Sequence, residues 1–180
     1  MTDARISGVG TASRAEAFRR LAAEHLDEAY RLARAITGNR VDAEDATHDA
    51  FVQAWRKWAS LRDPTRFDAW FNRILVHTCR NRLRRSSRRR TQDLSDELAR
   101  HGPDPFRQSD DRDQLSNAIA MLSPDHRLVV VLRYYRDLST RQIAGQLGIR
   151  EGTVSSRLHY ALRQLRTALD EAETRGASDG

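Results

Sequence analysis

The stretch LSTRQIAGQLGIREGTVSSRLHYALRQLRTAL, residues 138–169, restricts the possible folds of this chain more than any other segment. Ser139 and Gln142 stand at the spacing of a capping box, which starts a helix. Gly148 ends that helix, and a second helix starts at about Glu151. Two helices joined by a three-residue turn with glycine have the geometry of a helix-turn-helix. The sequence therefore predicts a helical C-terminal domain built around this motif.

The second helix of the motif has an apolar side and a polar side. Its predicted buried seam consists of Val154, Leu158, Ala161, Leu162, Leu165 and Leu169. The polar side is basic near its N-terminal end, where a recognition helix meets base edges. The candidate duplex-binding residues are Arg141, Arg150, Glu151, Thr153, Ser155, Ser156, Arg157, His159, Tyr160 and Arg163. Residues 139–166 carry five arginines and one acid, which favours phosphate contact, although a helical hairpin without a ligand is the alternative interpretation.

Segments before the motif predict supporting helices. Ser123 is followed by Pro124, which places a cap and then a proline at the first helical position. The predicted core side of this helix consists of Leu128, Val129, Val131, Leu132 and Tyr135. Leu115, Ile119 and Leu122 recur at helical spacing and indicate another helix before it.

The N-terminal part of the chain predicts three more helices. Residues 14–37 form an amphipathic helix that stops at Gly38 and Asn39. The second helix runs from about Asp42, its predicted N-cap, to Ala59, and its apolar stripe consists of Ala46, Ala50, Phe51, Ala54, Trp55 and Trp58. The third begins near Asp68 and reaches about Ser87, with an apolar side of Trp70, Phe71, Ile74, Leu75, Thr78 and Leu83.

Charge is strongly segregated along the chain, whose net charge is +6. Residues 42–55 hold four acids and no lysine or arginine, whereas residues 72–90 hold eight arginines and no acid. Residues 93–113 are acidic again, with seven acids against three arginines. The basic helix needs its large apolar residues for the core, so it suits nucleic acid better than a membrane surface. This alternation is typical of a protein that touches both nucleic acid and a protein partner.

These patterns divide the chain into two small units. We expect an all-α fold, with two small helical domains joined by a flexible acidic linker, the C-terminal one a helix-turn-helix. The predicted boundaries are a disordered tail over 1–13, a first domain over 14–88, a linker over 89–113, a second domain over 114–172 and a tail over 173–180. The sequence leaves open whether the two domains lie together or apart.

Several classes of protein are disfavoured. Cys79 is the only cysteine, so an internal disulfide framework is excluded and a reducing cytoplasm fits. No apolar run approaches the ~18 residues of a membrane span, and the N-terminus lacks a secretory signal. The six histidines are scattered, which disfavours a metal site. Paired carboxylates, a nucleophile triad and a glycine-rich phosphate loop are not found, which disfavours an enzyme.

Three segments in this order resemble a known family: DAEDATHDAFVQAWRKW, then FDAWFNRILVHTCRNRLRR, then LSPDHRLVVVLRYYRDLSTRQIAGQLGIREGTVSSRLHYALRQLR. Together they are similar to the extracytoplasmic-function (ECF) sigma factors of bacterial RNA polymerase, group 4 of the sigma-70 family. The resemblance covers about residues 14–170. It implies a sigma region 2 domain followed by a sigma region 4 domain.

The resemblance also implies a role for each surface. The acidic helix would dock on the clamp helices of the largest polymerase subunit through Asp45, His48, Asp49, Gln53 and Arg56. The loop SLRDPTRF and the basic helix after it would hold a flipped base and the opened promoter strand. The implied residues are Arg62, Asp63, Arg66, Phe67, Trp70, Arg73, His77, Arg80, Asn81, Arg84 and Arg85. The recognition helix would read the distal promoter element, and the acidic linker would thread toward the RNA exit path.

The implied partners are core RNA polymerase, through its clamp helices and beta flap, promoter DNA, and an anti-sigma factor in a stress or envelope response. The resemblance implies no cofactor, no catalytic residue, no metal and no membrane insertion. Relatives often have glutamine at the position of His48 and asparagine at that of His77, so the resemblance leaves open one docking contact and the identity of the melted-strand bases. The alternative hypothesis is a stand-alone helix-turn-helix regulator that binds duplex DNA without polymerase.

Overall fold

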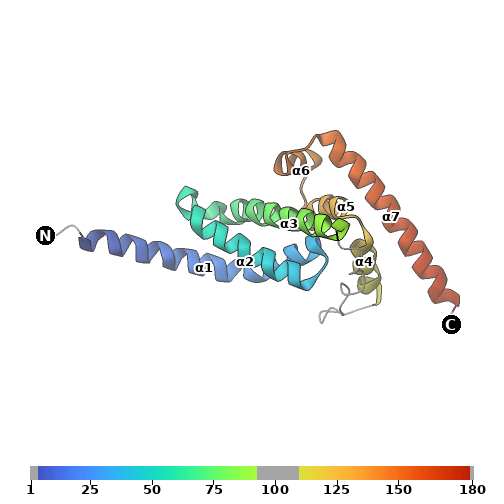
Figure 1. The fold of residues 1–180 in the computed structure, drawn as a ribbon, viewed down its shortest axis with the longest axis horizontal. Coiled ribbons are helices and arrows are strands. Elements are labelled where there is room, and N and C mark those ends of the chain that lie inside the picture. Colours follow the sequence, from blue (N-terminus) through green and yellow to red (C-terminus); the bar gives the residue numbers. More distant parts are fainter. Residues whose placement is uncertain (1–3, 93–109, 179–180) are drawn as a thin grey trace.

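The computed structural model describes residues 4–92 and 110–178 and is helical there, with no strand in those two ranges (Figure 1). The N-terminal domain contains α1 (Ala4–Thr37), α2 (Arg40–Lys57), the short 3-10 helices η1 (Trp58–Ser60) and η2 (Pro64–Arg66), and α3 (Phe67–Gln92). The C-terminal domain contains α4 (Asp110–Met121), α5 (Pro124–Val130), the π-helical turn η3 (Val131–Tyr135), α6 (Thr140–Leu147) and α7 (Glu151–Ser178). The predicted all-α class with two domains is confirmed.

The helices extend into segments that were predicted as tails and linker. Helix α1 begins at Ala4, inside the predicted tail over 1–13, and α7 ends at Ser178, inside the predicted tail over 173–180. Helix α3 continues to Gln92, past the predicted boundary at residue 88. The remaining part of the predicted linker, residues 93–109, lies outside the described residues.

At the junction between α1 and α2, the predicted helix stop at Gly38 is correct, but the predicted N-cap at Asp42 is not. Gly38 follows the last residue of α1 with φ +79°, a left-handed conformation that glycine adopts without steric cost. The N-cap of α2 is Asn39, whose side chain accepts a hydrogen bond from the backbone N–H of Asp42 at 2.8 Å. Asp42 itself lies in the first turn, where the positive end of the helix dipole stabilises its carboxylate. The predicted N-cap at Asp42 is therefore wrong by one turn.

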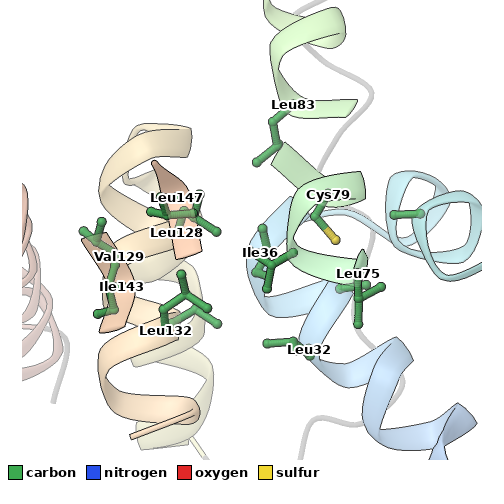
Figure 2. Close-up of a cluster of buried hydrophobic side chains, with 14 of the residues drawn as sticks. Leu32, Ile36, Leu75, Cys79, Leu83, Leu128, Val129, Leu132, Ile143 and Leu147 are labelled. Carbon is green, nitrogen blue, oxygen red and sulfur yellow. The ribbon is translucent and has the colours of Figure 1, made fainter. Parts of the chain in front are cut away.

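The core of the N-terminal domain contains a cluster of aromatic rings beside its aliphatic side chains. Phe67 is 1% exposed and stacks on Phe71 with 5.5 Å between ring centroids and an angle of 6° between the ring planes. Trp58 meets Phe67 edge to face from η1. Figure 2 shows the seam between α1 and α3, where Leu32, Ile36, Leu75, Cys79 and Leu83 gather. Trp55 was predicted in the buried stripe of α2 but is 48% exposed, and its ring lies 5.2 Å from that of Phe18 between centroids.

The core of the C-terminal domain is aliphatic, and Leu128, Val129, Leu132, Ile143 and Leu147 face one another in it (Figure 2). The predicted capping box is present, since Ser139 and Gln142 each bond the backbone of the other. Gly148 ends α6 with φ +64°, as predicted. Tyr135 and Leu162 were predicted to be buried, but both are exposed; Tyr135 is the last residue of the π-helical turn η3, and Leu162 lies beside the buried Ala161 on α7.

The two domains pack against each other. Helix α5 and the turn η3 of the C-terminal domain contact α1, and α5 lies beside the C-terminal end of α1 in Figure 1. The arrangement of the domains, which the sequence left open, is therefore compact in this structure.

Candidate nucleic-acid interface

The predicted docking residues form one acidic face of α2. Asp45, His48, Asp49 and Arg56 are exposed, and they lie on the side of α2 that is turned away from the alanines packed in the core. Gln53 differs from them, since it is half-buried and its amide donates to the hydroxyl of Thr78 in α3 at 3.1 Å. The structure thus brings four of the five residues together at the surface, while Gln53 joins α2 to α3.

Arg82 of α3, which was not among the predicted site residues, holds this acidic face. Its guanidinium donates to Asp42 at 3.2 Å through Nε, to Asp49 at 3.2 Å through Nη1, and to Asp45 through Nη2. One cation thus balances three carboxylates that are spaced along one side of α2, which lowers their mutual repulsion. Helical spacing could have found this residue, because Arg82 follows the buried Cys79 by three positions and therefore lies at the edge of the core.

The basic face of α3 is partly open and partly occupied. Arg73, His77, Arg84 and Arg85 are exposed, and the amide of Asn81 lies 3.2 Å from Nδ1 of His77. Trp70 is half-buried against the aromatic core. Arg80 is half-buried as well, because its Nη1 donates to the backbone oxygen of Leu147 in the C-terminal domain at 2.5 Å.

The loop before α3 contains three of the predicted strand-binding residues at the surface: Arg62, Asp63 and Arg66. Asp63 caps η2, accepting from the hydroxyl of Thr65 at 2.6 Å and from its backbone N–H at 3.0 Å. The Thr65 hydroxyl and then the Thr65 amide stabilise the ionised carboxyl, so the pKa of Asp63 lies below its usual value. The predicted contact by Phe67 is corrected, because this ring lies inside the core and cannot reach DNA in this structure.

The N-terminal half of α7 and the turn before it present the predicted duplex-binding residues. The exposed ones are Arg150, Glu151, Ser155, Ser156, His159, Tyr160 and Arg163, together with Arg141 on α6. Arg163 lies over the ring of Tyr160 at 5.3 Å from its centroid, a cation–π pair at the surface. Glu151 accepts from the hydroxyl of Thr140 at 2.7 Å, which ties the start of α7 to the start of α6.

Two of the predicted duplex-binding residues are less accessible. Thr153 is half-buried in the first turns of α7. Arg157 is half-buried too, and its guanidinium is paired with Asp125 of α5. A base contact by Arg157 therefore requires that this ion pair opens first.

The part of the chain that the structure describes contains no group of three or more His, Cys, Asp and Glu residues that could hold a metal ion. No helix in that part is long and apolar enough to cross a membrane. Burial raises the pKa of the Cys79 thiol to about 12, which leaves it a packed apolar group rather than a nucleophile.

Comparison with known proteins agrees with this division into two parts. Residues 21–89 match the family Sigma-70 region 2, and residues 118–167 match the family Sigma-70, region 4. The chain is 40% identical over 176 residues to the ECF RNA polymerase sigma factor SigL of Mycobacterium tuberculosis, an alignment that covers 93% of this chain and 97% of the relative. It is also 34% identical over 149 residues to the RNA polymerase sigma-E factor of Streptomyces avermitilis, covering 82% of each chain.

Solved structures show the same fold. The sigma factor RpoE of Bartonella quintana, crystallised with the anti-sigma factor NepR, has a TM-score of 0.65 and 24% identity, over 85% of this chain and 96% of that one. CnrH in complex with the cytosolic domain of CnrY has a TM-score of 0.56 and 26% identity, over 88% of this chain and 95% of that one. The class is a two-domain sigma factor with regions 2 and 4. The chain belongs to the ECF sigma factors of the sigma-70 family.

Proposed function

We propose that this sigma factor directs core RNA polymerase to promoters by dividing DNA recognition between its two domains. The face of α3 with Arg73, Arg84 and Arg85 holds the opened strand, and the N-terminal half of α7 reads the duplex of the distal element. The observation that carries this proposal is that both helices are packed through apolar seams and expose basic residues on the other side. Guanidinium groups on fixed helices supply phosphate contacts without a large loss of conformational freedom.

The acidic face of α2 is the proposed surface for the polymerase. Asp45 and Asp49 are exposed on a helix that the aromatic core holds firmly, and Arg82 fixes the direction in which both carboxylates point. Such a face suits a partner helix with basic side chains. The beta flap is the proposed second contact of the polymerase, on the C-terminal domain.

The chain itself performs no chemistry under this proposal, because RNA synthesis is the reaction of the polymerase, and the site of action is the cytoplasm. An anti-sigma factor is a further proposed partner, supported by the likeness to CnrH, whose structure was solved with the cytosolic domain of CnrY. The inducing condition is proposed to be a stress at the cell envelope.

Charge reversal tests the docking face. Asp45→Arg places a cation next to Arg82 and should abolish co-purification with core RNA polymerase, while Glu24→Arg, an exposed site on α1, provides the same change of charge outside the face. Circular dichroism checks that both variants fold. If Asp45→Arg still co-purified like the wild-type factor, α2 would not be the docking face.

In vitro transcription tests the division of DNA recognition and separates the proposal from the stand-alone regulator. With core polymerase and a genomic library of templates, the wild-type factor should produce defined start sites, and Arg163→Ala should reduce their use more than Arg166→Ala, one turn further along α7. A base contact at Arg163 is worth about 1–3 kcal/mol of binding. A gel shift that shows tight, specific duplex binding without polymerase, combined with no defined start sites, would support the stand-alone regulator instead.

A further inference from the structure

We propose that Arg157 and Asp125 are a positioning pair for the recognition helix α7. Their ion pair sets how α7 is rotated against α5, and therefore which side chains of α7 meet the DNA. Arg157 itself contacts no base in this arrangement and acts through other residues of α7. The inference rests on the proposed function in one respect, namely that the N-terminal half of α7 reads duplex DNA.

Two rows of residues on opposite sides of α7 define its orientation. The buried row consists of Val154, Leu158, Ala161 and Leu165. The outer row consists of Ser156, His159 and Arg163, which are all exposed. Each residue of the outer row is two positions from a residue of the buried row, which corresponds to a rotation of about 200°. The outer row therefore faces away from the domain core and is the row that can enter a groove of DNA.

Arg157 belongs to neither of these rows. It lies in a flank row that consists of Thr153, Arg157, Tyr160 and Gln164. Each of these residues is one position from a residue of the buried row, a rotation of about 100°. Thr153 and Arg157 are half-buried, which agrees with a place at the margin of the core. The backbone position of Arg157 therefore does not direct its side chain to the outer row.

The N-terminal turn of α5 is tied to this flank row at two places. Nη2 of Arg157 donates to Oδ2 of Asp125, in the first turn of α5. Two turns further along α7, Oε1 of Gln164 lies 3.1 Å from Nδ1 of His126. Both ties are on one side of α7 and come from adjacent residues of α5. A rotation of α7 about its axis would break both of them, and the charge-assisted bond is the stronger one.

A third tie holds α7 from the other side. Glu151, the first residue of α7, accepts from the hydroxyl of Thr140 in α6 at 2.7 Å. Glu151 precedes Val154 by three positions, so it lies about 60° from the buried row in the direction opposite to the flank row. Helix α7 is thus held between α6 and α5, and Arg157 with Asp125 provides the ionic tie on the α5 side.

The burial of the pair favours a positioning role over direct contact with DNA. The side chain of Arg157 is 23% exposed, whereas that of Asp125 is 54% exposed. A guanidinium that turned toward DNA would have to leave this site and would leave the carboxylate of Asp125 without its cation. An unpaired carboxylate on a DNA-binding domain repels phosphates. The pair therefore contributes most to DNA binding when it stays closed.

Asp125→Ala provides a test whose expected sign differs from that of simple electrostatics. The substitution removes a negative charge from the DNA-binding domain, which by itself strengthens binding to phosphates. Loss of the tie to Arg157 should weaken binding instead. Asp170→Ala is the matched control, since it removes the same charge from an exposed position near the end of α7. Asp125 is exposed too, so the domain should keep its fold.

Arg157→Ala breaks the pair from its other side, with Arg166→Ala as its control at an exposed position of α7. The double variant Asp125→Ala/Arg157→Ala shows whether the two residues act as one unit. If they do, its effect equals that of either single variant, because the interaction can be lost only once. Urea unfolding followed by circular dichroism measures the stability of every variant.

The readout is transcription in vitro by core RNA polymerase loaded with each variant. One template carries the most-used start site that the wild-type factor produces from the genomic library. The others carry one changed base pair each in the distal element of that promoter. The ratio of transcription from the original template to that from the changed templates measures how well α7 discriminates between bases. A loss of folded protein lowers transcription from all templates equally and leaves this ratio unchanged.

Asp125→Ala and Arg157→Ala should each lower transcription from the original template by about tenfold, the cost of a displaced base contact. Both should also narrow the ratio, because base contacts that are out of place distinguish the changed base pairs less. The double variant should be no weaker than either single variant, and Asp170→Ala and Arg166→Ala should leave the ratio unchanged.

Two results would overturn the positioning pair. Equal or stronger transcription with Asp125→Ala, together with a loss in Arg157→Ala, would mean that Arg157 contacts DNA itself. Weaker transcription with an unchanged ratio would mean that the pair only stabilises the domain. If the wild-type factor produced no start sites but bound a duplex by itself, the proposed function would fail. The same ratio would then be measured by gel shift on that duplex and its single-base-pair variants, with the same outcomes for the pair.

Discussion

The two domains are both built from helices, but their cores differ in chemistry. The N-terminal domain packs aromatic rings, among them Phe18, Trp58, Phe67 and Phe71, at the base of the basic helix α3. Among the described residues of the C-terminal domain, the buried hydrophobic side chains are all aliphatic, and its tyrosines lie at the surface. Aromatic pairs add a preferred geometry to the area they bury, whereas small aliphatic groups adapt more easily to their neighbours.

The aromatic residues of the N-terminal domain pack its core, and Phe67 is an example. The resemblance to sigma factors placed Phe67 among the residues that hold the opened promoter DNA. The structure uses this ring to join η1 and α3 instead. The basic face of α3 is thus held by rings beneath it, whereas the polar face of α7 is held by an aliphatic seam.

The largest effect is expected from an aromatic truncation. Phe71→Ala should lower the free energy of unfolding by about 3–5 kcal/mol, because it removes a buried ring that stacks on Phe67 and on Phe51. All three tryptophans, at 55, 58 and 70, lie in the N-terminal domain, so tryptophan fluorescence during urea unfolding follows this domain. Trp55→Ala, at a half-exposed ring, is the control and should cost less. A loss below ~1 kcal/mol in Phe71→Ala would show that the ring stack does not stabilise the domain.

A smaller effect is expected from an aliphatic truncation in the C-terminal domain. Leu132→Ala leaves a cavity in a core that can partly relax, and the free energy of unfolding should fall by about 2–4 kcal/mol. Circular dichroism should show this loss more strongly than tryptophan fluorescence does. Leu162→Ala, at an exposed leucine of α7, should change the free energy by less than ~0.5 kcal/mol. Equal losses in both variants would contradict the assignment of this core.

Local signals in the sequence predicted much of both domains. Ser139, Gln142 and Gly148 act within one turn of their own helix, so their roles could be read from spacing alone. Exposure was harder to predict, because Trp55, Tyr135 and Leu162 lie on the margin of an apolar stripe, where a rotation of a few tens of degrees decides whether a side chain is buried.

The contacts between distant elements could not be predicted from the sequence. Arg82, Arg127 and Arg136 each contact residues of helices that are far away in the chain. The residues next to them in the sequence give no signal that predicts those contacts. The arginine-rich composition even favoured the simpler interpretation that arginines bind DNA. In the structure several of these arginines instead bond helix ends or carboxylates of the protein itself. Two of the predicted DNA contacts are engaged in this way: Arg80 bonds the backbone oxygen of Leu147, and Arg157 pairs with Asp125.

A third prediction tests the start of the helix-turn-helix. Ser139→Ala removes the side-chain half of the capping box and should lower the free energy of unfolding of the C-terminal domain by about 1 kcal/mol. Hydrogen exchange of the α6 amides should increase, while the amides of α1 and α3 should not change. Ser155→Ala, an exposed serine within α7, is the control. Uniform changes in exchange across both domains would show that the cap acts on the whole molecule and not on α6 alone.

The smallest effect on stability is expected from a change of pH, and it concerns only the free energy of unfolding of the N-terminal domain. Burial raises the pKa of Cys79 from 9.0 to about 12, so between these values the unfolded chain loses the thiol proton while the folded chain keeps it. The folded state then binds more protons than the unfolded state, and the stability of the N-terminal domain falls as the pH rises above 9. At pH 9.5 the loss is about 1 kcal/mol or less, which follows from ionisation of the unfolded thiol alone.

Cys79→Ala removes the ionisable thiol, so the stability of this variant should lack the decrease that the thiol causes above pH 9. The free energy of unfolding of the wild type, measured by tryptophan fluorescence, should therefore fall relative to that of Cys79→Ala as the pH rises from 7 to 10. A difference that stayed constant from pH 7 to 10 would mean that the seam between α1 and α3 does not hold the thiol away from water.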